Sequence, residues 1–196
     1  MEVFLVRHLE IPSYEKGVCV GQSDVALTET GLANIQPLAE TLADLEPEVI
    51  ITSDLQRCKK LAEAIGSCLN LQIEVNPEWR EINFGEWENR EWEELRENDP
   101  ENVKKWIDDY VHVTPPEGES FFQLFERVGN QLMDLTRREK KRIIIVTHSG
   151  AIRSALCFAL GIPLDRSFSL EISYGAIAGL HYLNDRWSLF RLTNQL

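Results

Sequence analysis

Residues 143–146 (Ile-Ile-Ile-Val) are the most restrictive feature of this sequence. They lie in a predicted strand, residues 142–147, that is apolar on both faces, whereas a strand with one solvated face alternates apolar and polar residues. Such a strand belongs in a parallel sheet that helices cover on both sides. The chain has 196 residues, enough for one substantial domain of this kind.

Other segments alternate between strand and helix patterns. Thr28 is the expected N-cap of a helix over residues 28–45, and Pro37 should either kink that helix or displace its start. We therefore expect an α/β fold, a three-layer α/β/α sandwich with a mostly parallel sheet, as a single domain over residues 1–196. The other predicted elements are strands at residues 2–6, 48–52, 71–75 and 142–147, helices opening at Asp54 and covering residues 120–138 and 149–160, and two C-terminal strands meeting at a turn near Asn184-Asp185.

The segment from Trp79 to Pro116 differs in composition from the rest, because it is rich in Trp and Glu. It predicts two polar helices, the second starting at Asp99-Pro100, since Pro is favoured at the first helical position. Long excursions from α/β folds often carry function. We therefore expect a helical, lid-like insertion at about residues 86–116.

The net charge of −12 argues against a nucleic-acid-binding protein. The basic cluster within residues 137–142 stands where a helix is expected to end, and cations there interact favourably with the helix dipole. An acidic protein can still bind a phosphate, provided that a few arginines converge in one cleft.

Several features indicate a cytoplasmic protein. Residues 1–8 lack the basic leader and the long apolar core of a signal peptide. No apolar stretch approaches the roughly 20 residues that span a bilayer, so we expect no membrane partner. The cysteines lack the close pairing of a zinc site or a disulfide framework, and we expect them to be small core or half-buried residues in a reducing compartment. They are Cys19, Cys58, Cys68 and Cys157.

Two histidines, His8 and His148, stand directly after predicted strands. In open α/β sheets, ligands gather beyond the carboxyl ends of the strands. Arg7 precedes the first histidine, Arg57 lies one turn into the helix after another strand, and Glu81 follows a further strand. A nucleophile, two guanidinium groups, a second imidazole and an acid together suffice for phosphoryl transfer without a metal.

These residues lie in three recognisable segments. They are residues 5–10 (Leu-Val-Arg-His-Leu-Glu), 53–58 (Ser-Asp-Leu-Gln-Arg-Cys) and 146–153 (Val-Thr-His-Ser-Gly-Ala-Ile-Arg). They resemble the Arg-His-Gly-Glu signature, the Ser-x-x-x-Arg segment and the second-histidine motif of the histidine phosphatase superfamily, also called the phosphoglycerate mutase-like family. Leu9 replaces the usual small residue of the first motif. The resemblance runs to about residue 160 and implies a phosphoglycerate mutase-like fold.

Three further stretches indicate a branch of that superfamily. They are residues 17–24 (Gly-Val-Cys-Val-Gly-Gln-Ser-Asp), 80–88 (Arg-Glu-Ile-Asn-Phe-Gly-Glu-Trp-Glu) and 115–121 (Pro-Pro-Glu-Gly-Glu-Ser-Phe). They resemble the corresponding parts of alpha-ribazole phosphatases, which remove the 5′-phosphate of alpha-ribazole phosphate during assembly of the cobalamin nucleotide loop. The resemblance implies the same substrate for this chain.

The superfamily resemblance also implies a role for each catalytic residue. His8 would attack phosphorus with its neutral ring nitrogen, forming phosphohistidine. Arg7, Arg57 and a protonated His148 would hold the equatorial phosphate oxygens. Glu81 would donate a proton to the leaving alkoxide and then deprotonate the attacking water.

Backbone N–H groups at Gly21, Gln22 and Ser149 are further candidates for substrate binding, the last because it stands at a predicted helix start. The scheme requires no metal and no other cofactor. The expected partner is therefore a small-molecule phosphate monoester.

Alternatives remain open at this point. A phosphoglycerate mutase or a broad-specificity phosphatase of the same superfamily would share the catalytic core. A mutase needs a second cationic pocket, for which the nearby candidates are Arg80, Arg90, Lys104 and Lys105. A non-catalytic, phosphate-binding regulatory protein is disfavoured because all the catalytic elements are present.

Overall fold

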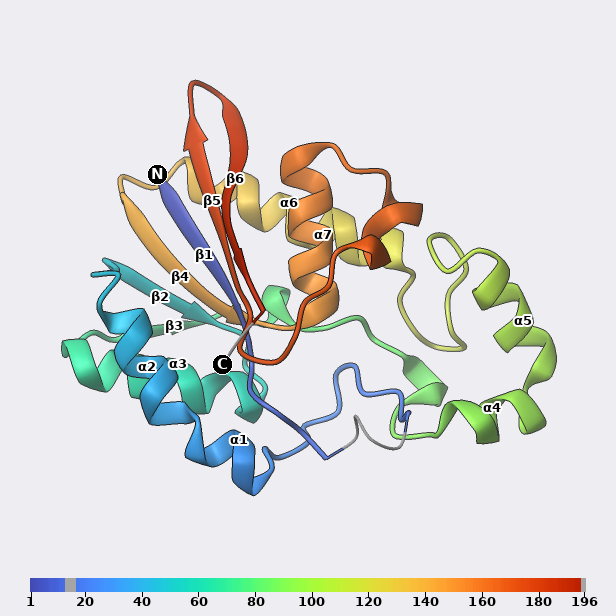
Figure 1. Ribbon diagram of the computed structural model, residues 1–196. Helices are drawn as coiled ribbons and strands as arrows, with labels where there is room; N and C mark the ends of the chain where they lie inside the picture. The colour runs from blue at the N-terminus through green and yellow to red at the C-terminus, as the bar shows by residue number, and fades with distance from the viewer. Residues whose placement is uncertain (13–16, 195–196) are drawn as a thin grey trace.

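Six strands form one sheet in the computed structural model, which describes residues 1–12 and 17–194 (Figure 1). The strand order is β3-β2-β4-β1-β5-β6, and β3, β2, β4 and β1 are parallel to one another. β5 pairs antiparallel with β1, and β6 pairs antiparallel with β5. This confirms the predicted α/β class with a mostly parallel sheet. The strands are β1 (Glu2–Arg7), β2 (Val49–Thr52), β3 (Ile73–Val75), β4 (Arg142–Thr147), β5 (Ile177–Leu183) and β6 (Arg186–Thr193).

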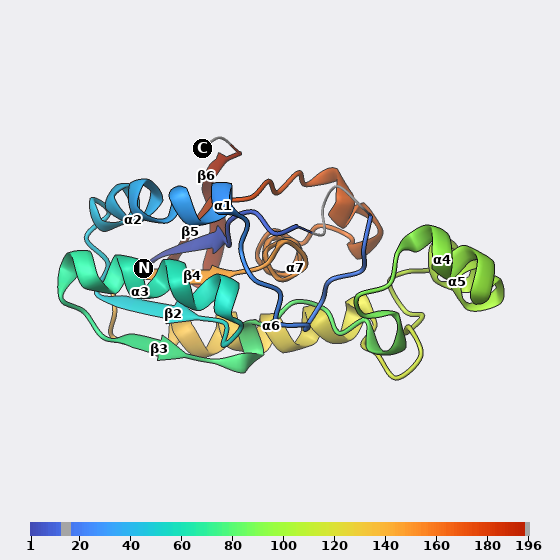
Figure 2. The ribbon, with the colours of Figure 1, turned by 90° about the horizontal axis from the view of Figure 1, so that it is seen from below.

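Helices cover both faces of this sheet, as Figures 1 and 2 show. Ile143 and Ile145 of β4 pack in one core with α6 and α7, whereas Ile144 and Val146 pack in a second core with α2 and α3. Because side chains alternate along a strand, an uninterrupted apolar run is what a sheet buried on both faces requires. The helices are α1 (Glu29–Ala33), α2 (Ile35–Ala43), α3 (Gln56–Leu69), α6 (Phe121–Thr136) and α7 (Ser149–Leu160).

The helix predicted over residues 28–45 is divided at Asn34. The hydroxyl of Thr28 accepts a hydrogen bond from the N–H of Gly31 (2.9 Å), which confirms Thr28 as the N-cap of α1. α2 starts at Ile35, so Pro37 lies in its first turn, where backbone N–H groups have no intrahelical partner. Pro37 therefore belongs to the start of a second helix and does not bend the middle of a single one.

The start predicted for α3 at Asp54 was wrong, because the helix begins at Gln56. The N–H of Gln56 donates to Asp24 (2.8 Å), a residue of the loop before α1, so a side chain distant in sequence satisfies the helix start. Asp54 forms an ion pair with Arg80 instead.

The third strand is shorter than the predicted residues 71–75. The N–H of Leu71 donates to the carbonyl of Gly66 (3.0 Å) beside the end of α3, and pairing with β2 begins only at Ile73. The C-terminal hairpin lies where it was predicted. Asn184 and Asp185 both have positive φ (50° and 58°), as a tight turn between antiparallel strands requires.

Two short helices between β3 and α6 extend away from the sheet (Figures 1 and 2). They are α4 (Trp92–Asn98) and α5 (Pro100–Asp108), preceded by the 3₁₀ turns η1 (Pro77–Trp79) and η2 (Gly85–Trp87). Pro100 occupies the first position of α5, as predicted. The α4–α5 segment has its own small core, which consists of Cys19, Trp87, Leu95 and Val103.

The cysteines and the basic cluster at residues 137–142 can now be placed in the structure. All four cysteines are free, and Cys68 alone among them is exposed. Within residues 1–12 and 17–194, no helix combines the length and the apolar character that crossing a bilayer needs. In the basic cluster, Arg137, Arg138 and Arg142 form ion pairs with Asp134, Glu74 and Glu2.

Candidate active site

The candidate site lies at the carboxyl ends of β1 and β4. These strands are parallel neighbours, with Arg7 opposite Thr147, so the next residue of each strand leaves the sheet at the same edge. Those residues are His8 and His148, and their ring centroids lie 5.1 Å apart. The sheet thus brings together two side chains that are far apart in the sequence.

The hydrogen bonding of His8 fixes the tautomer of its ring. Nδ1 lies 2.7 Å from the carbonyl oxygen of Leu9, and a carbonyl can only accept, so Nδ1 carries the hydrogen. Nε2 therefore keeps its lone pair. Burial and the charges of Arg57 and Arg7 hold the pKa of His8 well below its usual range. The ring is neutral at neutral pH, as a nucleophile must be.

His148 is fully buried beside His8 and has different partners. Its Nδ1 accepts from Nε of Arg57 (3.3 Å), which leaves the hydrogen on Nε2, 3.0 Å from the hydroxyl of Ser53. Burial and the charges of nearby arginines, Arg57 first among them, hold the pKa of His148 well below its usual range. This environment favours a neutral ring, in contrast to the protonated His148 expected from the sequence.

Two guanidinium groups flank His8. Arg57 is almost completely buried and donates to the carbonyls of Ser23 and Gly21, both at 2.6 Å. Arg7 donates to the carbonyl of Ile172 (2.6 Å), and its guanidinium carbon lies 3.9 Å from the centre of the Tyr174 ring. These contacts fix both cations at the edge of a common pocket.

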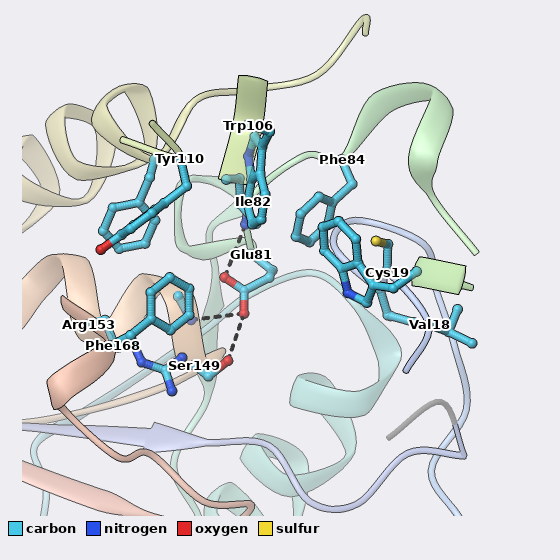
Figure 3. Close-up of a pocket in the computed structure, with 14 residues that line it drawn as sticks. Val18, Cys19, Glu81, Ile82, Phe84, Trp106, Tyr110, Ser149, Arg153 and Phe168 are labelled. Carbon is cyan, nitrogen blue, oxygen red and sulfur yellow. Dashed lines mark hydrogen bonds between the residues drawn. The ribbon is translucent and has the colours of Figure 1, made fainter. Parts of the chain in front are cut away.

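Glu81 reaches the same region from the irregular segment between η1 and η2. One carboxylate oxygen accepts from the N–H of Gly150 (2.9 Å) and the hydroxyl of Ser149 (3.2 Å), at the N-terminus of α7, and the other accepts from the N–H of Ile82 (3.1 Å) (Figure 3). A Cβ atom on residue 150 would lie 2.2 Å from this carboxylate, so any larger residue there would displace the carboxylate of Glu81. Glu81 acts as an acceptor in all three contacts.

A pocket of about 260 Å³ opens in front of His8. Four of the other predicted residues line it with His8: Arg7, Arg57, Glu81 and Ser149. This polar pocket therefore combines a ring nitrogen that keeps its lone pair, two cations and a carboxylate. A phosphate group is complementary to these features.

Gly21 and Gln22 differ from their expected arrangement. Their backbone N–H groups donate to the carboxylate of Glu88, at 3.1 Å and 2.8 Å, and so are directed away from the polar pocket. The side-chain amide of Gln22 donates to the carbonyl of Glu81 (3.2 Å). A Cβ at Gly21 would lie 2.0 Å from the carbonyl oxygen of Ile82, which requires glycine at this close approach.

A second pocket of about 180 Å³ adjoins the first, and Glu81 and Ser149 line both. Figure 3 shows Glu81 surrounded by the aromatic rings of this aromatic pocket, with Arg153 beside them. Tyr110 and Phe168 both line it and contact each other edge to face, with their ring centroids 4.9 Å apart. The other aromatic residues that line it are Phe84, Trp92, Trp106 and Phe121.

Sequence reasoning singled out the Trp-rich segment as a lid-like insertion but did not assign Trp92 and Trp106, which lie in it, to a pocket. It missed Phe168, which lies in the 3₁₀ helix η3 (Leu164–Ser169), and Arg153 of α7. Arg153 stands inside the second-histidine motif, one turn after Ser149. That spacing placed it on the same side of the helix and was a usable signal.

No group of three or more His, Cys, Asp and Glu side chains placed to hold a metal ion occurs in the parts of the chain that the structure describes.

Comparisons with known proteins agree with this geometry. The family model of the histidine phosphatase superfamily (branch 1) matches residues 3–195. The chain is 26% identical to the adenosylcobalamin/alpha-ribazole phosphatase of Escherichia coli strain K12, covering 99% of this chain and 96% of that protein. It is 31% identical to a probable phosphoglycerate mutase (GpmB) of Proteus mirabilis, covering 95% and 87%.

Among solved structures, the alpha-ribazole phosphatase from Shigella flexneri superposes with a TM-score of 0.92 at 27% identity, covering 100% of this chain and 96% of that one. The names of these relatives thus differ in the activity that they give. The family match extends over nearly the whole chain and includes both histidine motifs. The chain belongs to branch 1 of the histidine phosphatase superfamily and is a phosphatase of that superfamily.

Proposed function

We propose that this protein hydrolyses a phosphate monoester through a phosphohistidine on His8, and that its substrate is alpha-ribazole 5′-phosphate. The observation that carries the proposal is the state of His8: a neutral ring whose Nε2 keeps its lone pair, in a pocket with two guanidinium groups. Such a nitrogen is a competent nucleophile, and the cations stabilise the charge of the group that it attacks.

The first step transfers the phosphoryl group to the protein. Nε2 of His8 attacks phosphorus while the bond from phosphorus to the ester oxygen breaks. Glu81, protonated at this stage, gives its proton to the departing alkoxide. Its position between the polar and aromatic pockets suits this role, because the broken bond joins the phosphate to the organic group.

The second step releases phosphate. Glu81, now a carboxylate, takes a proton from a water molecule whose oxygen attacks phosphorus as the bond to Nε2 breaks. Inorganic phosphate leaves, and both His8 and Glu81 return to their starting states. One carboxylate thus serves as acid and base in turn.

The arginines and His148 would stabilise the phosphoryl group during both steps. Three N–H bonds of Arg57 are used by His148, Ser23 and Gly21, and one hydrogen on each terminal nitrogen remains for phosphate oxygens. The positive charges of the arginines favour a neutral His148, and the negative charges of a phosphate dianion beside His8 would offset them. Substrate binding should therefore favour protonation of His148.

The aromatic pocket supports the choice of substrate. The leaving group of alpha-ribazole 5′-phosphate carries a flat aromatic base, and rings such as those of Trp106, Tyr110 and Phe168 offer faces and edges for it to pack against. The similarity to named alpha-ribazole phosphatases points the same way.

One observation favours a second candidate, a leaving group with a carboxylate such as that of 3-phosphoglycerate. Arg153 lines the aromatic pocket and supplies a cation beside Glu81. Of the four cations expected for a mutase, Arg80, Arg90 and Lys104 form ion pairs with Asp54, Glu94 and Asp108, and Lys105 is exposed on α5.

Phosphate release from three substrates tests the proposal. We expect kcat/KM for alpha-ribazole 5′-phosphate to exceed that for ribose 5-phosphate and 3-phosphoglycerate by at least about tenfold, since about 1.4 kcal/mol from packing of the base corresponds to that factor. Preference for 3-phosphoglycerate would favour the second candidate, and its conversion to 2-phosphoglycerate would indicate a mutase.

A further inference from the structure

The backbone that carries Glu81 has no regular secondary structure. Residues 80–84 lie between η1 and η2 and belong to no helix or strand. Backbone carbonyls in such a segment need partners outside it, because a buried polar group without a hydrogen bond destabilises the fold. The position of Glu81 therefore depends on side chains that bind this segment.

Arg127, on α6, supplies most of those contacts. Its guanidinium donates to the carbonyls of Glu78 (2.7 Å), Arg80 (3.1 Å) and Glu81 (3.3 Å). One planar group thus binds three carbonyls within four consecutive residues. A lysine could not reproduce this pattern, because its ammonium is a single point of donation.

Glu119 fixes Arg127 in turn. Its two carboxylate oxygens accept from Nε (3.0 Å) and Nη2 (2.8 Å) of Arg127, which is the two-pronged arrangement that orients a guanidinium best. Both side chains are only 16% exposed. Glu119 also accepts from the backbone N–H of Asn83 (3.3 Å), so it holds the other end of the same segment.

We propose that Arg127, held by Glu119, is a positioning residue for Glu81. It does not line the polar or the aromatic pocket, and its hydrogen bonds reach the site through the backbone of Glu81. Its charge also helps to lower the pKa of His148, an effect that Arg127→Lys retains. This inference rests on the role of Glu81 as acid and base under the proposed function. Proton transfer requires hydrogen-bond distance to the ester oxygen, and a misplacement of about 1 Å can cost on the order of a hundredfold in rate.

The test compares Arg127→Met with Glu81→Gln on substrates that differ in leaving group. The substrates are ribose 5-phosphate and p-nitrophenyl phosphate. The alkoxide that leaves from ribose 5-phosphate is a poor leaving group and needs a proton, whereas nitrophenolate leaves without one. We expect Arg127→Met to lower kcat/KM for ribose 5-phosphate by about tenfold to a hundredfold. The rate of the nitrophenolate burst, which reports phosphoenzyme formation, should change by less than about threefold.

A double-mutant cycle separates positioning from general structural damage. If Arg127 acts through Glu81, adding Arg127→Met to Glu81→Gln should lower the ribose 5-phosphate rate by less than about threefold further.

A second variant, Arg127→Lys, keeps the charge without the planar donor set and should show the same leaving-group dependence. If Arg127→Met does not fold, Arg127→Lys takes its place in the test. Arg137→Met, which removes an exposed ion pair beyond the end of α6, is the matched control and should leave both rates unchanged.

Equal losses for the two substrates, or a full additional loss in the Glu81→Gln background, would overturn the positioning role. That result is distinguishable from failure of the proposed function. If Glu81→Gln itself shows no dependence on the leaving group, the acid–base role is wrong and the inference falls with it. A selective loss in Glu81→Gln without one in Arg127→Met would overturn the inference alone.

Discussion

The rings of His8 and His148 lie 5.1 Å apart, yet their nitrogens are engaged differently. Among the described residues, His8 hydrogen bonds only through Nδ1, to the carbonyl of Leu9, and it keeps the lone pair on Nε2. His148 has a partner at both nitrogens, Arg57 and Ser53. Of the two imidazoles, His8 is therefore the one that we propose as the nucleophile.

This difference predicts separate outcomes for the two histidine variants. His8→Ala should abolish the covalent phosphoenzyme. His148→Ala should slow its formation by about a hundredfold to a thousandfold, as expected for loss of a group that stabilises the transition state, while the label stays on His8. The measurement is a rapid, acid-free quench with labelled substrate followed by peptide mapping. Label on His148, a serine or a cysteine would contradict the assignment.

Glu81→Gln should cause phosphohistidine to accumulate. Loss of general acid catalysis typically costs roughly a hundredfold to ten-thousandfold when the leaving group is poor. With p-nitrophenyl phosphate, phosphoenzyme formation should continue while hydrolysis by water slows, because that step still needs a base. Stopped-flow absorbance should then show a nitrophenolate burst followed by a slow steady state. If no burst appears and the rates with p-nitrophenyl phosphate and with ribose 5-phosphate fall by the same factor, Glu81 is only a structural carboxylate.

The buried histidines predict a pH dependence of stability. Burial lowers the pKa of His148 in the folded protein, so below about pH 6.5, the ordinary pKa of histidine, the unfolded chain binds more protons than the folded one. The resulting stabilisation is complete above that pH and is lost as the pH falls. Urea denaturation between pH 7 and 5 should show a smaller decrease in the free energy of unfolding for His148→Gln than for wild type. An equal decrease in the two proteins would contradict this contribution of His148.

Phe168→Ala should alter substrate preference with little effect on stability, because the side chain is 58% exposed while it lines the aromatic pocket. Loss of one aromatic contact of about 1 kcal/mol should reduce kcat/KM for alpha-ribazole 5′-phosphate roughly fivefold to tenfold. The value for ribose 5-phosphate, which lacks the base, should not change. Phe190→Ala on β6 is the matched control at a similarly exposed phenylalanine (44%). Equal losses on both substrates would argue against binding of the base at Phe168.

The features that could be predicted from the sequence depend on local pattern. The bounds of β4 follow from its apolar run, and the placement of His8 and His148 follows from the rule that parallel strands end at one edge of a sheet. The predicted start of α3 was wrong because Asp24, which is distant in sequence, accepts the hydrogen bond of a backbone N–H in its first turn.

Loop contacts were equally inaccessible to sequence patterns. The N–H groups of Gly21 and Gln22 were assigned to phosphate, but the carboxylate of Glu88 accepts from them. The contacts of Arg127 with the backbone around Glu81 likewise join α6 to an irregular segment. Hydrogen bonds between segments that are distant in sequence follow no periodicity, so no local sequence pattern predicts them.

The separate small core of the α4–α5 segment has a consequence for how this fold diversifies. The histidines and arginines proposed for catalysis stand at strand ends of the central sheet or on α3, whereas Trp92 and Trp106 reach the aromatic pocket from helices packed around Trp87, Leu95 and Val103. Exchanges within that minor core can reshape the pocket without disturbing the pairing of β1 with β4. Substrate range can therefore diverge among related chains while the chemistry at phosphorus stays the same.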